Sequence, residues 1–187
     1  MKCHLITTDG WRLISHVLQT SSIVVSRRLD GQNINDDTVI PFATALTTNK
    51  CLRHLVLYWG EFTDRIWDTF TDFLCDDSSV ESTYHSNHTL RTIQIHDRYL
   101  IQLLPPVDIA HHLSLNGAYY DVGKVGIARH KIIENHFSTS KINTQAFALM
   151  SVPVLSQAVE WIGRELLGFS LLYQVLRGVL VPKLSDY

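Results

Sequence analysis

The residues of this chain best suited to chemistry are its ten histidines, which could bind a metal ion or move a proton. The closest spacings are the His111-His112 pair, the His85-x-x-His88 segment and the six-residue step from His130 to His136. A zinc site needs histidine or cysteine ligands at spacings that bring three or four of them to one ion. None of these histidines combines with a cysteine or a carboxylate in that way. We therefore expect no metal ligands.

Nucleophilic and phosphate-binding motifs are also missing from the sequence. Serine, histidine and aspartate are all present, but no serine lies in the context of a nucleophile elbow. The segment Gly123-Lys124-Val125-Gly126 has neither the spacing of a phosphate-binding loop nor a strand before it. The sequence predicts a protein that is not an enzyme and that uses no cofactor.

Composition limits the classes of partner. The chain has 187 residues, a formal net charge of −2 and a pI near 6.5. A general binder of nucleic acid or of anionic membranes needs a basic face, so we expect neither partner. The N-terminus has no apolar signal segment, and three cysteines without metal or redox spacing are typical of an intracellular protein, which predicts a cytoplasmic location. The apolar run 166–181 contains Gln174 and Arg177 and is short for a membrane span, so a buried cap helix is expected there.

Elements that could position a site come from a repeat with a spacing of 28 residues between Ile6 and Val80. All but one of the compared positions are apolar, and the exception is His85. A repeat of roughly 20 to 50 residues indicates a solenoid, a propeller or an array. The aligned sets include Trp11, Val39 and Trp67; Ile14, Phe42 and Phe70; Val17, Ala45 and Phe73; Leu18, Leu46 and Leu74; and Val24, Leu52 and Val80.

Each repeat unit combines a helical pattern with a strand pattern. Polar residues such as Thr7-Thr8-Asp9 can cap a starting helix, and the apolar residues that follow have helical spacing. Pro41 is expected in the first turn of its helix, where its missing N–H has no intrahelical partner. Residues 52–57 then form a strand-like run. Because a strand, a helix and a parallel strand connect in a right-handed sense, the repeat predicts a right-handed βα solenoid with a concave parallel sheet and convex helices.

The segment Leu52-x-x-Leu55-x-Leu57-x-x-Gly60-x-Phe62-Thr63-Asp64 resembles the leucine-rich repeat signature, with Gly60 at its asparagine-type position. The period and the helical second half of each unit resemble the ribonuclease-inhibitor-like subclass. The segments 78–90 and 104–106 are similar to its algal-type members. The resemblance implies an α/β fold and a leucine-rich repeat region at residues 1–97.

Residues 98–187 are expected to form an all-helical C-terminal cap on the last repeat. A solenoid needs such a cap because its terminal repeat otherwise exposes apolar interior and an open strand edge. Helical patterns predict helices at residues 108–115, 124–137, 143–152, 153–167 and 168–181.

The first predicted strand, residues 24–29, departs from the repeat, because Arg27 occupies the position that Leu55 occupies in the second predicted strand. A fully buried arginine would be costly, so we expect an edge strand or an arginine that reaches outward. The strand expected before Ile6 would begin upstream of Met1. An uncapped first edge predicts self-association.

The candidate binding surface is the concave face of the sheet. Neighbouring residues of a strand alternate between its two faces, so the residues between the leucines point away from the core. Aromatic residues and arginine are over-represented at binding hot spots, which favours this face as the partner site. The expected partner-binding residues are Arg28, Asp30, His54, Val56, Tyr58 and Trp59, together with Gln94 and His96 if Leu90-x-x-Ile93-x-Ile95 is the third strand.

Three functions remain open from the sequence. The first is a non-catalytic protein–protein interaction module or scaffold that binds an unknown protein through this face. The second is a regulatory subunit acting on an enzyme such as a small GTPase, which the resemblance suggests because the family includes Ran GTPase-activating proteins. The third is a truncated repeat remnant without an independent role.

Overall fold

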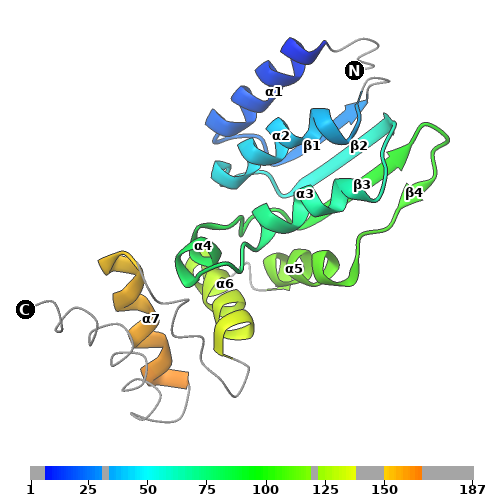
Figure 1. Cartoon of the computed structure of the whole chain (residues 1–187). Coiled ribbons are helices and arrows are strands. Elements are labelled where there is room, and N and C mark those ends of the chain that lie inside the picture. Colours follow the sequence, from blue (N-terminus) through cyan, green and yellow to red (C-terminus); the bar gives the residue numbers. More distant parts are fainter. Residues whose placement is uncertain (1–6, 31–33, 119–121, 138–149, 166–187) are drawn as a thin grey trace, which may run out of the picture. The chain divides into compact units, whose positions relative to one another are not determined.

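A computed structural model describes residues 7–30, 34–118, 122–137 and 150–165. The chain divides into two compact units (Figure 1). The sheet unit comprises Met1–Cys75 and Ser86–Ile127, and the helical unit comprises Asp76–His85 and Ala128–Tyr187. The elements are α1 (Thr8–Thr20), β1 (Ser26–Asp30), α2 (Asp36–Thr48), β2 (His54–Gly60), α3 (Arg65–Leu74), α4 (Val80–His85), β3 (Thr92–Asp97), β4 (Gln102–Leu103), α5 (Val107–Ala118), α6 (Gly123–Ile132), a π-helical turn (Ile133–Phe137) and α7 (Val152–Glu165).

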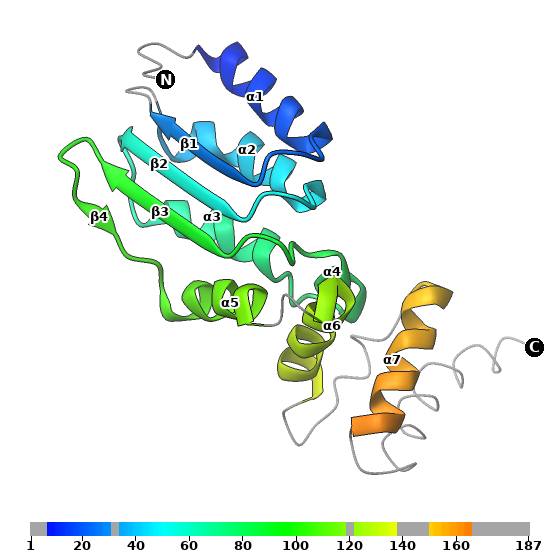
Figure 2. The same ribbon diagram turned by 180° about the vertical axis from the view of Figure 1, so that it is seen from behind.

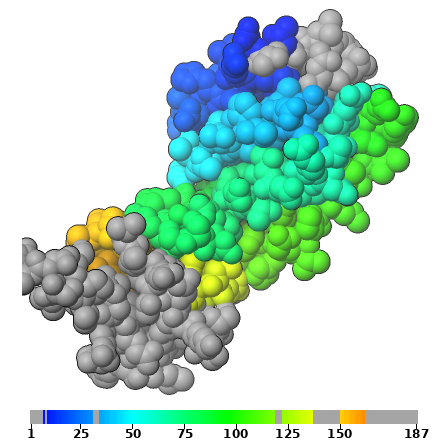
Figure 3. Space-filling view, in the orientation of Figure 1, coloured from blue at the N-terminus to red at the C-terminus, as the bar shows by residue number. Residues whose placement is uncertain are grey.

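The sheet has four strands in the order β1-β2-β3-β4. Strands β1, β2 and β3 are parallel, and the short β4 pairs antiparallel with β3. Helices α1, α2 and α3 lie side by side on one face of the sheet and hide it in Figure 3. In Figure 2 the other face of the sheet is in front, and none of the described helices lies over its three parallel strands. This arrangement confirms the predicted α/β class.

Local sequence explains where the first helices begin. The Thr7 side chain accepts a hydrogen bond from Gly10 N at 3.2 Å at the start of α1. At the start of α2, Asn35 and Thr38 form a capping box in which each side chain accepts from the backbone N–H of the other. The expectation for Pro41 is wrong, because it is the sixth residue of α2 and lies beyond the first turn.

Strand register shows where the 28-residue spacing stops. Leu55 of β2 pairs with Arg27 of β1, 28 residues earlier, but with Ile93 of β3, 38 residues later. The extra ten residues match the length of the segment Asp76–His85, which belongs to the helical unit. Across this segment, Asn87 N donates to Phe73 O at 2.8 Å. If the ten residues are left out, this is a helical bond between residues four apart.

Val80 shows the consequence of this insertion. The repeat aligned it with Val24 and Leu52 at the start of a strand, and that prediction is wrong because Val80 lies in α4. Its true counterpart is Leu90, which is buried two residues before β3, as Leu52 is two residues before β2. Both the helix position and the strand position are apolar, so the pattern could not separate them.

The core of the sheet unit lies between the sheet and the three helices. As predicted, Trp11 and Trp67 are core residues, exposed by only 4% and 3%. Val17 departs from the pattern and is 51% exposed, because α1 is the first helix of the row and none of the described helices covers its outer side. Arg27 is exposed on the edge strand β1, as expected. The main apolar contributors are Leu18, Leu29, Phe42, Leu46, Leu55, Leu57, Phe70, Leu74, Ile93 and Ile95.

The second half of the chain agrees with the predicted helices only in part. Helices α5, α6 with the π-helical turn, and α7 correspond to the predictions at 108–115, 124–137 and 153–167. The predicted all-helical cap is wrong in one respect, because β4 lies within residues 98–187 and extends the sheet. The units do not divide at residues 97/98, since β4 and α5 belong to the sheet unit. The helix predicted at 168–181, and that at 143–152 up to residue 149, lie outside the described residues.

Candidate functional site

The predicted partner-binding residues lie together on the face of the sheet opposite the helices. Along β2 and β3, exposed or half-buried side chains alternate with buried leucine and isoleucine, whereas in β1 only Leu29 is buried. Burial of one face leaves the other available for contacts. The predicted residues on this open face are Arg28 and Asp30 of β1, His54, Val56 and Tyr58 of β2, and Gln94 and His96 of β3.

Three of these side chains form a stack across three strands. The rings of Tyr58 and His96 are 4.3 Å apart between centroids and are inclined by only 2°. On the other side of Tyr58, the guanidinium carbon of Arg28 lies 4.2 Å from the ring centroid, which is cation–π geometry. We call Arg28, Tyr58 and His96 the open-face stack.

Strand register brings the members of this stack together. Tyr58 pairs with His96 on one side and with Asp30 on the other. Parallel strands lie about 4.8 Å apart, so paired residues on one face are in contact. Arg28 is two residues before Asp30 on the same face and donates from Nε to both carboxylate oxygens of Asp30, at 3.0 and 3.3 Å. This ion pair holds the guanidinium over Tyr58.

Trp59 lies at the edge of the stack in a β-bulge. Tyr58 pairs with His96 and Gly60 pairs with Asp97, which leaves Trp59 as the extra residue of β2. Its φ is +67°, in the left-handed region that disfavours side chains, and the residue is 41% exposed. The next residue is Gly60, where a Cβ would lie 2.1 Å from the ring of Phe62, so a larger residue there would have to displace that ring. Strained non-glycine residues are concentrated at functional sites.

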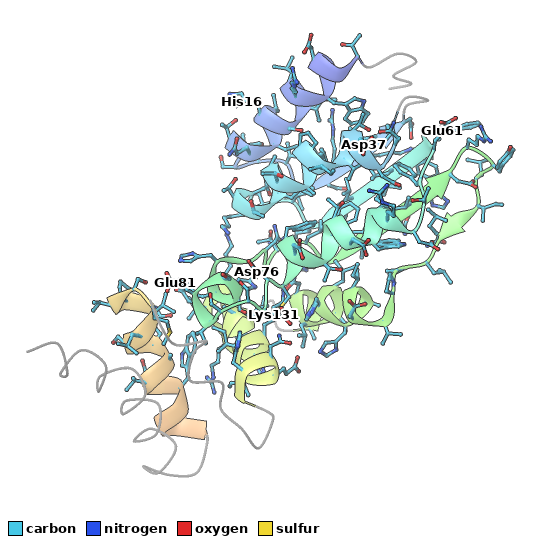
Figure 4. The ribbon with its side chains drawn as sticks, viewed as in Figure 1. His16, Asp37, Glu61, Asp76, Glu81 and Lys131 are labelled. Carbon is cyan, nitrogen blue, oxygen red and sulfur yellow. The ribbon has the colours of Figure 1, made fainter. Side chains whose placement is uncertain are left out.

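Beyond the bulge, a cavity of about 310 Å³ opens at the carboxyl ends of β2 and β3. Arg98 Nη1 lies 3.2 Å from Glu61 Oε1, and its guanidinium also lies 4.9 Å from the ring centroid of Tyr99. Figure 4 shows Glu61 at this end of the sheet, where β2 ends, and Asp37 where α2 begins. The cavity adjoins the bulge, because its lining begins at Gly60.

The other predicted residues add polar contacts but no catalytic arrangement. His54 Nδ1 lies 2.9 Å from Thr92 Oγ1, which joins β2 to β3 on the open face. Among the described residues, no hydrogen bond or salt bridge connects a carboxylate to the ring of His54, as a hydroxyl–imidazole catalytic pair would require. In the same part of the chain, no group of three histidine, cysteine or acidic residues could hold a metal ion.

Sequence reasoning missed a ladder of three buried asparagines, of which Asn49 and Asn87 lie in the turns before β2 and β3 and Asn116 lies in α5. The side-chain amide of Asn49 donates to Leu18 O. Asn87 Nδ2 donates to Leu46 O at 2.7 Å and to Asn49 O at 3.2 Å. Asn116 Nδ2 donates to Leu90 O at 2.7 Å and to Asn87 O at 3.3 Å. The available signal was the Asn-x-x-Leu motif, which occurs at Asn49 and again at Asn87.

The helical unit contains two polar connections of its own. Burial alone would raise the pKa of Glu81, but hydrogen bonds from Ser151 and His85 outweigh burial, and the pKa is lowered. Ser151 donates from its backbone N and from its hydroxyl, at 3.1 and 2.9 Å. Figure 4 shows Glu81 on α4 and Asp76 just before that helix.

His136 is buried in the same unit, and its Nε2 lies 2.8 Å from Thr83 Oγ1. Thr83 Oγ1 also lies 2.7 Å from Asp76 O and 3.0 Å from Ser79 O, so the imidazole, this hydroxyl and two backbone carbonyls form one hydrogen-bonded cluster. Burial lowers the pKa of His136, although the nearby Asp77 acts against that shift. The ring is therefore neutral near pH 7.

Comparisons with protein-family models, with curated proteins and with solved structures find no match to this chain. Within the described residues, no helix combines the length and the apolar character needed to cross a membrane.

Proposed function

We propose that this chain is a non-catalytic protein-interaction module of the leucine-rich repeat type, which binds a protein partner through the open face of its sheet. The observation that carries the proposal is the open-face stack of Arg28, Tyr58 and His96. Arginine and tyrosine are the residue types most enriched at binding hot spots. A stack already ordered before binding loses little side-chain entropy when a partner arrives.

The repeat architecture is supported by three features of the sheet unit. Three parallel strands have their helices on one face, and the steps between strands are equal once Asp76–His85 is left out. Asparagines at equivalent positions close successive turns through the same kind of side-chain hydrogen bond. A repeated unit that buries its apolar face only against its neighbours is the defining property of a solenoid.

Charge on the open face indicates the chemistry that a partner would present. Arg28 uses Nε for Asp30, which leaves its two terminal nitrogens for an acceptor on the partner. A partner carboxylate could accept both donors in a planar arrangement. An aromatic or apolar side chain beside it would cover Tyr58 and the exposed Trp59.

The test is capture of a partner from native cell extract by the immobilised chain and its variants. Tyr58→Ala and Arg28→Ala should each weaken capture by about 30-fold, the effect of losing a hot spot worth about 2 kcal/mol. The matched control is Tyr99→Ala, which removes a tyrosine under Arg98, outside the open face. The proposal fails if capture survives both open-face variants, or if Tyr99→Ala abolishes it equally.

The alternative role as a regulatory subunit stays a prediction from the resemblance. A nucleotide-hydrolysis assay with a captured GTPase separates it from passive binding. A rate that changes with the chain would favour regulation, and an unchanged rate would favour the interaction module.

A second function, self-association, is favoured by the exposed first edge of the sheet unit. In the described structure no strand pairs with the outer edge of β1, and apolar side chains of α1 and the α1–β1 connection are exposed beside it. At the position of Val17, the equivalent residues Ala45 and Phe73 are buried. A second copy in an isologous arrangement would cover these side chains and pair both β1 edges. The exposed apolar residues are Leu13, Val17, Ile23 and Val25.

Sedimentation equilibrium over a range of concentrations tests this second function. The native chain should show a concentration-dependent dimer, and Val17→Glu should abolish it because a charge would be buried at the contact. The matched control is Val107→Glu, an exposed valine on α5 away from this edge. A native chain that stays monomeric at high concentration would rule out self-association.

A further inference from the structure

A second cavity, of about 360 Å³, lies at the amino ends of the strands, away from the open-face stack. It lies wholly within the sheet unit and is lined by turns before the strands and by the start of α6. Among its lining residues in the described part of the chain, four are the cations Lys50, Arg53, Arg91 and Lys124, and none is acidic. Such a concentration of positive charge is unexpected in a chain whose net charge is −2.

Strand pairing places two of these cations side by side. Arg53 N donates to Val25 O at 2.7 Å, and Arg91 N donates to Arg53 O at 2.8 Å. Val25, Arg53 and Arg91 therefore hold equivalent positions immediately before β1, β2 and β3. The strand spacing of about 4.8 Å brings the two arginine stems onto neighbouring turns. Lys50 stands three residues before Arg53 on the same turn.

Lys124 adds a fourth cation from the first turn of α6. Its Nζ donates to Lys50 O at 3.0 Å. Burial lowers the pKa of Lys50, and repulsion from Lys124 lowers it further. Within the described residues, Lys50, Arg53 and Lys124 take part in no salt bridge. Mutual repulsion on this scale is relieved when an anion binds between like charges.

The start of α6 supplies a second kind of anion-binding group. Gly123 and Lys124 line the cavity and are the first two residues of this ten-residue helix. The first backbone N–H groups of a helix have no intrahelical acceptor, and the helix dipole places partial positive charge there. An oxyanion bound in the cavity would therefore lie near the start of α6 as well as near the cationic side chains.

We propose that this cavity binds a small phosphate-bearing ligand, with a phosphomonoester or inorganic phosphate held between the turns before β2 and β3 and the start of α6. A phosphate dianion matches several cations better than a single carboxylate does, because its charge and its acceptor oxygens are more numerous. The volume is at the lower end of small-molecule sites, which span about 300 to 1,000 Å³, and suits a compact ligand. The site is independent of the proposed partner face.

The test is a ¹H–¹⁵N NMR titration of the full chain with inorganic phosphate and, separately, with glucose 6-phosphate, at constant ionic strength. Both should produce saturable shifts at the amides of Arg53 and Arg91, and glucose should produce none. Tighter binding of glucose 6-phosphate would identify an organic phosphate as the ligand, and equal binding would identify the phosphate group alone.

Variants separate a built site from general attraction to positive charge. Combining Lys50→Gln with Lys124→Gln should weaken phosphate binding about 100-fold, because each charged hydrogen bond accounts for about tenfold. The matched control combines Arg12→Gln with Arg65→Gln, which removes the same charge from exposed sites outside the cavity. Equal weakening in the control, or shifts that never saturate, would overturn the proposal.

A second measurement does not depend on these variants folding. The Cys51 thiol lines the cavity and is partly accessible. Bound phosphate should slow its alkylation by iodoacetamide in the native chain by severalfold, as followed by mass spectrometry of the Cys51 peptide. An alkylation rate that is unchanged at saturating phosphate would contradict the proposed location.

Discussion

The asparagine ladder yields the sharpest stability prediction, because Asn87 connects three successive turns of the sheet unit. Its amide nitrogen donates to Leu46 O and Asn49 O, and its Oδ1 accepts from Thr89 N and Leu90 N, both at 2.9 Å. The residue is 1% exposed, so water cannot replace these bonds without rearrangement. Asn87→Ala removes these four hydrogen bonds and a fifth from the Thr89 hydroxyl at 3.2 Å, each worth about 1 kcal/mol net, so we expect the free energy of unfolding to fall by about 4 to 5 kcal/mol.

Urea denaturation followed by circular dichroism and tryptophan fluorescence measures this loss. A loss of this size is a large part of the stability of a typical domain, about 5–15 kcal/mol. The comparison variant is Asn35→Ala, which removes the exposed cap of α2 and should cost only about 1 kcal/mol. Asn87→Asp tests the donors separately, because a carboxylate keeps the acceptor oxygen but cannot donate to Leu46 O. The reasoning is refuted if Asn87→Ala costs no more than Asn35→Ala.

Three further predictions concern the bulge and the helical unit. Trp59→Gly should leave the free energy of unfolding unchanged or raise it by up to about 1 kcal/mol, since glycine tolerates the positive φ, and it should weaken partner capture. A lower free energy of unfolding in urea denaturation would show that the backbone at Trp59 is not strained. Glu81→Gln should destabilise the helical unit near pH 7, and the difference in stability between the native chain and the variant should vanish as pH falls through the lowered pKa of Glu81. Thermal melts at a series of pH values measure this difference, and a difference that stays constant with pH would refute the prediction. The native chain should lose stability as pH falls below about 6.5, because the pKa of His136 is lowered on folding and the unfolded chain therefore binds the proton first. His136→Gln should flatten this part of the curve of stability against pH. An unaltered curve would exclude His136 as the cause of the pH dependence.

Much of the fold could be predicted from apolar spacing alone, because burial of the same positions recurs in each turn. Trp11 and Trp67 are core residues for this reason. The pattern failed at Val17 and Val80 for different physical reasons. Burial of a repeat position depends on a neighbouring helix, which Val17 lacks, and an apolar residue fits a helix as well as a strand, which misplaced Val80.

The sequence allowed us to predict which face of the sheet carries the candidate site, but not how its side chains are oriented. Alternation along β2 correctly placed His54, Val56 and Tyr58 on the side away from the helices. Aligning Leu90-x-x-Ile93-x-Ile95 with the second strand correctly put Tyr58 and His96 at equivalent positions, but the 2° angle between their rings depends on side-chain rotamers, which spacing does not determine. The bulge at Trp59, with the Phe62 ring close to Gly60, was not indicated by any pattern in the sequence.

In-register parallel pairing explains why chemistry gathers at particular points of this sheet. Equivalent positions of successive turns lie side by side, so apolar residues at equivalent core positions pack continuously. The binding properties of the surface depend on the positions at which successive turns carry different residues. Asp30, Tyr58 and His96 occupy one such row, and Arg28 reaches across to it to complete the open-face stack. Val25, Arg53 and Arg91 occupy another row at the amino ends of the strands. Packing requires neither row to contain these residues, because both lie outside the core. The two rows are therefore where changes of sequence can alter binding without disturbing the fold, and binding experiments on this protein should begin there.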